Sequence, residues 1–165
     1  MKPFLFGGGM INEVFIDNTI YSEIPGMLEA GTPNVSGAIG LGAACDFITQ
    51  ITYDEIKSHE HEIMSYAFEK LLADNDIEIY GSTITDLKCS VISFNIKGIP
   101  SHDLATVLDS EGVAIRSGQH CVMPWHLKTG IQTSARISFG IYSEKEDIDR
   151  LMVGIAKARE IILSQ

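Results

Sequence analysis

The most constraining feature of this sequence is the alternation of apolar and polar side chains over residues 89–96. Ile92, Phe94 and Ile96 fall on one side of an extended segment, and a serine and an asparagine fall on the other. Because successive side chains of a β-strand point to opposite faces, this pattern predicts a strand with one face in a core. Such a strand needs neighbours that hydrogen-bond to it and a layer that covers its apolar face.

The chain from residue 75 onward supplies elements in an order that suits such a core. Further strands are predicted over 77–80, 113–116 and 134–141, helices over 101–112 and 143–162, and an irregular segment over 117–130. Helices that pack on one face of a mostly antiparallel sheet give an α+β fold. We therefore predict the α+β class for this region.

Helix starts in the chain carry recognisable capping residues. The expected caps are Thr52 with Glu55, Ser101, and Ser143 with Glu146. The helix that begins after the first of these caps runs to about Ala73 and carries His59-Glu60-His61. Residues two apart point to different faces of a helix, so we expect a solvated face there and no metal site.

The first 35 residues lack the pattern of a self-contained domain. Residues 13–21 alternate roughly like a strand, and glycines and a proline then punctuate a loop. From Ser36 a helix is expected whose many small residues lower its intrinsic propensity, so close packing on another element must stabilise it. The predicted division is 1–35, connecting helices over 36–74, and a domain over 75–165.

Composition narrows the classes of protein that fit. The chain has 165 residues and a formal net charge of −10, whereas a nucleic-acid-binding domain needs a basic surface. Three widely spaced cysteines, Cys45, Cys89 and Cys121, argue against a disulfide framework and for a reducing compartment. No apolar stretch approaches the ~20 residues of a membrane-spanning helix, so a cytoplasmic protein without membrane contact is expected. Cys45 and Cys89 are expected to be core thiols.

The segment with the strongest chemical signal lies between two predicted strands. It reads Arg116-Ser117-Gly118-Gln119-His120-Cys121. A thiol acts as a nucleophile only as the thiolate, and nearby cationic groups favour that form. Arg116 is one such group, and His120 can also move a proton because its reference pKa lies near neutrality. We therefore predict that Cys121 is a nucleophile.

This pattern, Arg-x-Gly-x-His-Cys, resembles the active-site loop of SufS-type, or group II, cysteine desulfurases of the class V aminotransferase family. Residues 29–44 and 134–149 also resemble family segments, in the family's own order. The resemblance implies the C-terminal small domain of a fold-type I (aspartate aminotransferase-like) enzyme dependent on pyridoxal phosphate (PLP). Residues 1–35 would then be a detached edge segment of the large domain.

The resemblance implies roles for the residues of the loop and the late strand. Cys121 matches the persulfide-forming cysteine, which attacks the sulfur of a substrate cysteine held on PLP and leaves alanine. His120 beside it is a candidate for proton transfer. Arg136 matches the arginine that grips the substrate carboxylate, and Arg116 matches a second arginine near that site.

Cofactor binding is implied only in part. Thr32, next to Gly31, matches the threonine that reaches the cofactor phosphate of the neighbouring subunit in the family's homodimer. The family's cofactor lysine lies in a His-Lys dipeptide of the large domain, and no such dipeptide occurs here. We therefore expect neither tight PLP binding nor activity toward free cysteine from this chain alone.

The expected partners follow from the same resemblance. They are the large PLP domain or a separate chain that carries it, a second copy, and a sulfur-acceptor protein of the SufE or SufU type in iron–sulfur cluster assembly. Residues 1–50 are expected to expose apolar surface for such partners. Gln119 and Trp125-His126 depart from the usual family residues. These departures leave substrate and partner preference open. The alternative functions are a non-catalytic binding module, a PLP-free persulfide carrier and a selenocysteine lyase fragment.

Overall fold

The computed structural model describes residues 2–164, which form two compact units. The first unit is Met1–Ile51 and the second is Thr52–Gln165, so the boundary falls inside the predicted connecting-helix segment 36–74. Each unit is described by itself below.

The N-terminal unit is built around a two-stranded hairpin. Strand β1 (Ile11–Val14) pairs antiparallel with β2 (Thr19–Tyr21), followed by a short 3-10 helix η1 (Gly26–Leu28) and helix α1 (Val35–Ile51). The single strand predicted over 13–21 is wrong. The chain reverses there, and the Phe15 amide donates to the Asn18 carbonyl at 2.7 Å. An aspartate and an asparagine in this stretch suit such a turn.

Helix α1 presents apolar residues to solvent along its whole length. None of its residues is buried, and Ile39 and Leu41 are 70% and 67% exposed. An apolar helix without a covering layer marks an interaction surface in a folded protein. The expectation of exposed apolar surface over residues 1–50 is met by this helix.

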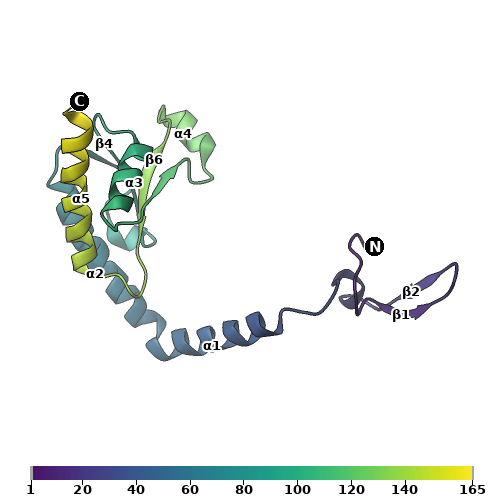
Figure 1. Cartoon of the computed structure of the whole chain (residues 1–165). Coiled ribbons are helices and arrows are strands. Elements are labelled where there is room, and N and C mark those ends of the chain that lie inside the picture. The colour runs from purple at the N-terminus through teal and green to yellow at the C-terminus, as the bar shows by residue number, and fades with distance from the viewer. Residues whose placement is uncertain (1, 165) are drawn as a thin grey trace. The chain divides into compact units, whose positions relative to one another are not determined.

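The C-terminal unit contains a four-stranded antiparallel sheet (Figure 1). Its order is β3 (Ile77–Tyr80), β4 (Val91–Ile96), β6 (Ser134–Ser138), β5 (Arg116–Gly118). The α+β class and the central strand are confirmed, because Ile92, Phe94 and Ile96 are at most 3% exposed. The strand predicted over 113–116 is displaced, since pairing with β6 begins only at Arg116.

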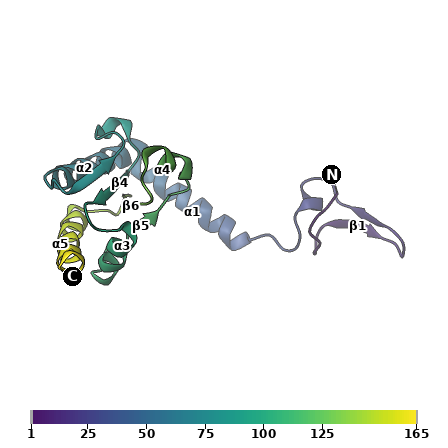
Figure 2. The same ribbon diagram turned by 90° about the horizontal axis from the view of Figure 1, so that it is seen from above.

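Helices cover the apolar face of this sheet. They are α2 (Tyr53–Leu72), α3 (Ser101–Ser110) and α5 (Lys145–Leu163), and their buried leucines and isoleucines join those of the strands in one core. A short helix, α4 (Met123–Thr129), lies within the predicted irregular segment 117–130 and sits over the other face of the sheet (Figure 2). Residues 85–87 form a further 3-10 turn, η2 (Thr85–Leu87).

The helix starts agree only in part with the predicted caps. The Thr52 hydroxyl accepts from the Glu55 amide, as predicted for α2. Ser101 is not a cap, because it is the first residue of α3 and its buried hydroxyl donates to the Thr133 hydroxyl at 2.9 Å. The box at the start of α5 is formed by Glu144 and Asp147, one residue later than predicted.

The predicted solvated face at His59-Glu60-His61 is wrong for its first two members. The His59 ring bonds the Ser143 carbonyl at 2.9 Å, and the Glu60 carboxylate accepts from the Ser90 hydroxyl. His61 is exposed and lies 2.7 Å from the Thr85 hydroxyl. These contacts tie α2 to its neighbours, and no cluster within residues 2–164 has the ligands for a metal ion.

No single described helix is long and apolar enough to cross a membrane. Helices α1 and α2 reach that composition only as a broken pair, and α2 contributes five residues to the core of the C-terminal unit.

A bidentate ion pair joins two helical segments of the C-terminal unit. The Arg159 guanidinium donates to both Asp74 carboxylate oxygens, at 2.7 and 2.8 Å, and joins α5 to the end of α2. Arg159→Ala is expected to lower the free energy of unfolding by about 1–3 kcal/mol, because it removes two charge-assisted hydrogen bonds in a partly buried site. Urea unfolding of the full chain measures this change.

The hydrogen bonds from Arg159 lower the pKa of Asp74. The contribution of the pair is therefore present above about pH 4 and is lost as the pH falls through the lowered pKa. Wild type and Arg159→Ala should converge in stability in acid. Lys145→Ala is the control because its exposed pair with Glu62 is open to solvent, and a loss as large as that of Arg159→Ala would contradict the assignment.

Candidate active site

A row of four directly paired residues crosses the face of the sheet opposite the core. Tyr80 of β3 pairs with Ser93 of β4, Ser93 pairs with Arg136 of β6, and Arg136 pairs with Arg116 of β5. Directly opposed residues point to the same face of a sheet, so these side chains line one face together. The alternation that buries Ala135 and Ile137 is what turns Arg136 to this side.

Arg116 and Arg136 are like charges placed directly opposite each other. This arrangement is destabilising by itself. Neither guanidinium has a carboxylate within ion-pair distance in the described part of the chain, and the buried Nε of Arg136 has no hydrogen-bond partner there. Two unpaired guanidiniums side by side fit a bound anion, for which a carboxylate is well shaped. The structure thus brings together both arginines predicted from sequence.

Cys121 lies on a tight turn that directly follows β5. The Val122 amide donates to the Gln119 carbonyl at 2.8 Å, and both central residues have positive φ, 50° for His120 and 61° for Cys121. Non-glycine residues pay about 1–2 kcal/mol each for this left-handed conformation. The turn holds the free Cys121 thiol in an exposed position, while Gly118 before it takes φ of 122° without such strain.

His120 is half-buried and held against β6. Its Nε2 lies 2.9 Å from the Ser134 carbonyl, which can only accept, so Nε2 carries the proton and Nδ1 is left with a lone pair. Nδ1 is buried without a partner in the described residues. Burial lowers the pKa of His120, and the nearby positive charge of Arg136 lowers it further. At pH 7 the ring is therefore a neutral imidazole with a free acceptor atom.

His126 and Ser134 are site residues that sequence reasoning missed. His126 on α4 is 1% exposed, and its Nε2 lies 3.1 Å from the hydroxyl of fully buried Ser134. With Tyr80, His120 and Trp125 they help to line a cavity of about 230 Å³ on the same face as the arginine row. The only signal in the sequence was the departure at Trp125-His126 from the residues usual in the family.

The other two cysteines are exposed, so the prediction of core thiols is wrong. Cys45 lies on α1, where no residue is buried. Cys89 precedes the first paired residue of β4, outside the alternation that buries that strand. All three thiols are therefore open to solvent, and Cys121 lies on the turn that directly follows β5, a strand of the arginine row.

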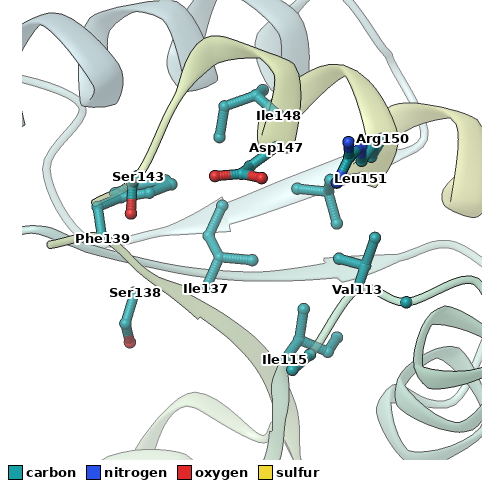
Figure 3. Close-up of a pocket in the computed structure, with 12 residues that line it drawn as sticks. Val113, Ile115, Ile137, Ser138, Phe139, Ser143, Asp147, Ile148, Arg150 and Leu151 are labelled. Atoms are coloured by element: carbon teal, nitrogen blue, oxygen red, sulfur yellow. The ribbon is translucent and has the colours of Figure 1, made fainter.

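A second cavity, of about 200 Å³, lies on the core side of the sheet (Figure 3). Ile115, Ile137 and Leu151 contribute apolar walls, and the Asp147 carboxylate and Arg150 are among its polar groups. None of the predicted site residues lines it. It is separate from the thiol and from the arginine row.

The sequence matches one known protein family over most of its length. The profile of the class-V aminotransferases matches residues 1–151. The chain belongs to the class-V aminotransferase family. Among curated members, a probable cysteine desulfurase of Halalkalibacterium halodurans is 42% identical over 97% of this chain, and the cysteine desulfurase of Haloferax volcanii is 39% identical over 98%. The resemblance seen in the loop motif is confirmed.

Solved structures of class-V relatives share the fold. The cysteine desulfurase CsdA of Escherichia coli, in an S-sulfonic acid form, matches with a TM-score of 0.79 and 31% identity over 98% of this chain. The apo cysteine desulfurase of Thermococcus onnurineus matches with a TM-score of 0.76 and 34% identity. This chain spans 39% and 38% of the length of the two curated relatives and 40% of each of these solved chains.

The class-V family is PLP-dependent, but the residues here fit the cofactor only in part. No lysine lines the cavity beside His120 and Ser134 in the described residues. Gly31 has φ of 89° and donates its amide to the Gly8 carbonyl, and Thr32 is exposed. Both belong to the N-terminal unit, so their assignment to the cofactor phosphate stays a prediction.

Proposed function

We propose that this chain is the sulfur-transfer part of a PLP-dependent cysteine desulfurase, which converts L-cysteine to L-alanine and leaves a persulfide on Cys121. The observation that carries the proposal is the pair of guanidiniums, Arg116 and Arg136, on adjacent strands, with an exposed thiol on the tight turn that directly follows the strand of Arg116. L-Cysteine offers a carboxylate to the two guanidiniums and a sulfur atom to the thiol.

The arginines bind and orient the substrate. A single carboxylate between Arg116 and Arg136 replaces the repulsion of two like charges by two attractive contacts. The buried Nε of Arg136 gains an acceptor at the same time. Binding energy from this end of the substrate is then available to fix the sulfur near Cys121.

Cys121 performs the sulfur transfer. Its thiolate attacks the substrate sulfur, a sulfur–sulfur bond forms as the carbon–sulfur bond breaks, and the electron pair of the broken bond stays on the substrate carbon. That carbon then takes a proton to give alanine, while the persulfide remains on Cys121. When bound, PLP supplies the electron sink for this chemistry.

His120 is suited to move the proton of the Cys121 thiol. Its neutral ring has a lone pair on Nδ1, and its Nε2 is fixed on the Ser134 carbonyl. It lies directly before Cys121 in the turn. A base whose pKa is lowered by burial is unprotonated at neutral pH and can accept a proton from the thiol.

In this proposal, the cofactor lysine and the surface that covers α1 belong to a further domain. We infer that a large PLP domain, in the same polypeptide or in a separate chain, covers α1 and supplies the cofactor lysine. Support comes from the exposed apolar residues of α1, such as Ile39 and Leu41, and from the relatives, which are longer. A homodimer and an acceptor protein of the SufE or SufU type, in iron–sulfur cluster assembly, complete the proposal.

Complementation tests this function. The chain is mixed with PLP, L-cysteine and a separately produced large domain of a relative, and alanine and the Cys121 persulfide are measured by chromatography and peptide mass spectrometry. We expect both products only when both polypeptides are present. An assembled pair that binds PLP and L-cysteine yet yields neither product would refute the proposal, and alanine from the chain alone would refute its incompleteness.

A PLP-free persulfide carrier is a second candidate. The exposure of the Cys121 thiol favours it, because a donor protein reaches this turn without any cofactor. In this case the Cys121 thiolate takes the outer sulfur atom from the persulfide of a donor protein, such as a rhodanese charged with thiosulfate, the donor cysteine leaves as its thiolate, and PLP has no effect. Failure of this transfer, with successful complementation, leaves the desulfurase as the function.

A further inference from the structure

Both chain neighbours of Cys121 are tied to one residue of the sheet. Before the cysteine, the His120 Nε2 donates to the Ser134 carbonyl at 2.9 Å. After the cysteine, the Val122 carbonyl accepts from the His126 Nδ1 at 3.3 Å, and the other nitrogen of His126 bonds the Ser134 hydroxyl at 3.1 Å. The cysteine turn is thus held at both ends by the backbone and side chain of a single serine.

The chemistry of these contacts fixes the tautomer of each ring. A carbonyl oxygen only accepts, so His126 carries its proton on Nδ1, and in the neutral ring Nε2 accepts from the Ser134 hydroxyl. His120 has the opposite arrangement, with its proton on Nε2. The two ring centroids lie 6.1 Å apart. One ring bonds the carbonyl of Ser134 and the other bonds its hydroxyl.

Burial makes these hydrogen bonds energetically important. His126 is 1% exposed and Ser134 is fully buried, so a polar atom of either residue left without a partner would destabilise the fold. These hydrogen bonds oppose the strain of the two left-handed residues in the turn. The Val122 carbonyl also accepts from the backbone amides of Trp125 and His126, which makes it the junction between the turn and α4.

We propose that His126 and Ser134 are positioning residues that hold the Cys121 turn in its left-handed conformation. They act through Val122 and His120 and do not contact the substrate. The effect on the turn stands on these contacts alone, and only its consequence for sulfur transfer rests on the proposed function.

The first test uses the unmodified chain. Nitrogen-15 NMR of the histidine side chains distinguishes the two tautomers, and we expect the proton of His126 on Nδ1 and that of His120 on Nε2 at pH 7.5. The opposite tautomer at His126 would break the bond to Val122 and overturn the proposal. No variant has to fold for this result.

The second test measures the turn by hydrogen exchange. His126→Met keeps an apolar side chain of similar volume and removes both ring hydrogen bonds. The Val122 amide, which closes the turn, is expected to exchange about ten times faster or more, while the amides of β4 do not change. His126→Gln, which restores a side-chain donor, should recover part of the protection. An unchanged exchange rate of the Val122 amide in folded His126→Met would contradict the proposed role of His126.

Leu127→Ala is the matched control, because Leu127 is the next residue on α4 and is 73% exposed. It should leave the Val122 amide as in wild type. In the complemented enzyme, His126→Met is expected to lower kcat about tenfold with KM for cysteine within about twofold, because the arginine row is intact. If wild-type complementation gives no alanine, the proposed function fails, while the NMR and exchange results still decide whether His126 and Ser134 hold the Cys121 turn.

Discussion

Cys121→Ser is expected to lower sulfur transfer by the complemented enzyme by at least about a thousandfold. The serine hydroxyl stays protonated at neutral pH, and no thiolate remains to attack the substrate sulfur. Losses of this order or larger follow when the nucleophile of an enzyme is removed. Alanine release and peptide mass spectrometry measure the loss, and the peptide that contains residue 121 should carry no persulfide.

The two other exposed thiols provide controls for this variant. Cys45→Ser and Cys89→Ser should form alanine and the Cys121 persulfide at wild-type rates, because both variants keep the Cys121 thiol and the turn that presents it. The unfolding midpoint of Cys121→Ser should match that of wild type, since the thiol is exposed and has no hydrogen-bond partner among residues 2–164. Sulfur found on Cys89 in place of Cys121 would assign the nucleophile to a different thiol, before β4, and refute the proposal.

The core of the fold was predictable because it depends on local periodicity. The alternation around Ile92 and Phe94 is enough by itself to predict a half-buried strand, and the four antiparallel strands and their covering helices followed from the order of the elements. The hairpin within 13–21 and the short helix α4 were missed. Both are decided by turns of a few residues, whose conformation depends on contacts with distant segments more than on their own propensity.

The residues of the candidate site were likewise predictable only in part. Residue type and order pointed to Cys121 and Arg116, the family resemblance added Arg136, and strand pairing then placed Arg116 opposite Arg136. The role of His126 was hidden because it depends on a hydrogen bond to Ser134, eight residues away across a turn. The exposure of Cys45 was missed for another reason: a helix of small and apolar residues looks buried in sequence even when none of its residues is covered, as in α1.

Arg136→Met should separate binding from stability at the arginine row. The variant keeps most of the apolar stem and removes the guanidinium, so kcat/KM for cysteine in the complemented enzyme is expected to fall on the order of a hundredfold to a thousandfold, mainly through KM. Loss of a bidentate carboxylate contact of about 2–5 kcal/mol accounts for this range.

The same substitution should not weaken the fold. It removes a like charge opposite Arg116 and a buried Nε that has no partner in the described residues, so the free energy of unfolding is expected to stay level or rise by up to about 1 kcal/mol. Arg150→Met, at an exposed residue of α5, is the control for losing one positive charge and should leave kcat/KM unchanged. A guanidinium with a merely structural role would give the reverse pattern, lower stability with an unaffected KM. A side chain that costs stability in the free protein and is needed only with substrate is there to bind the substrate.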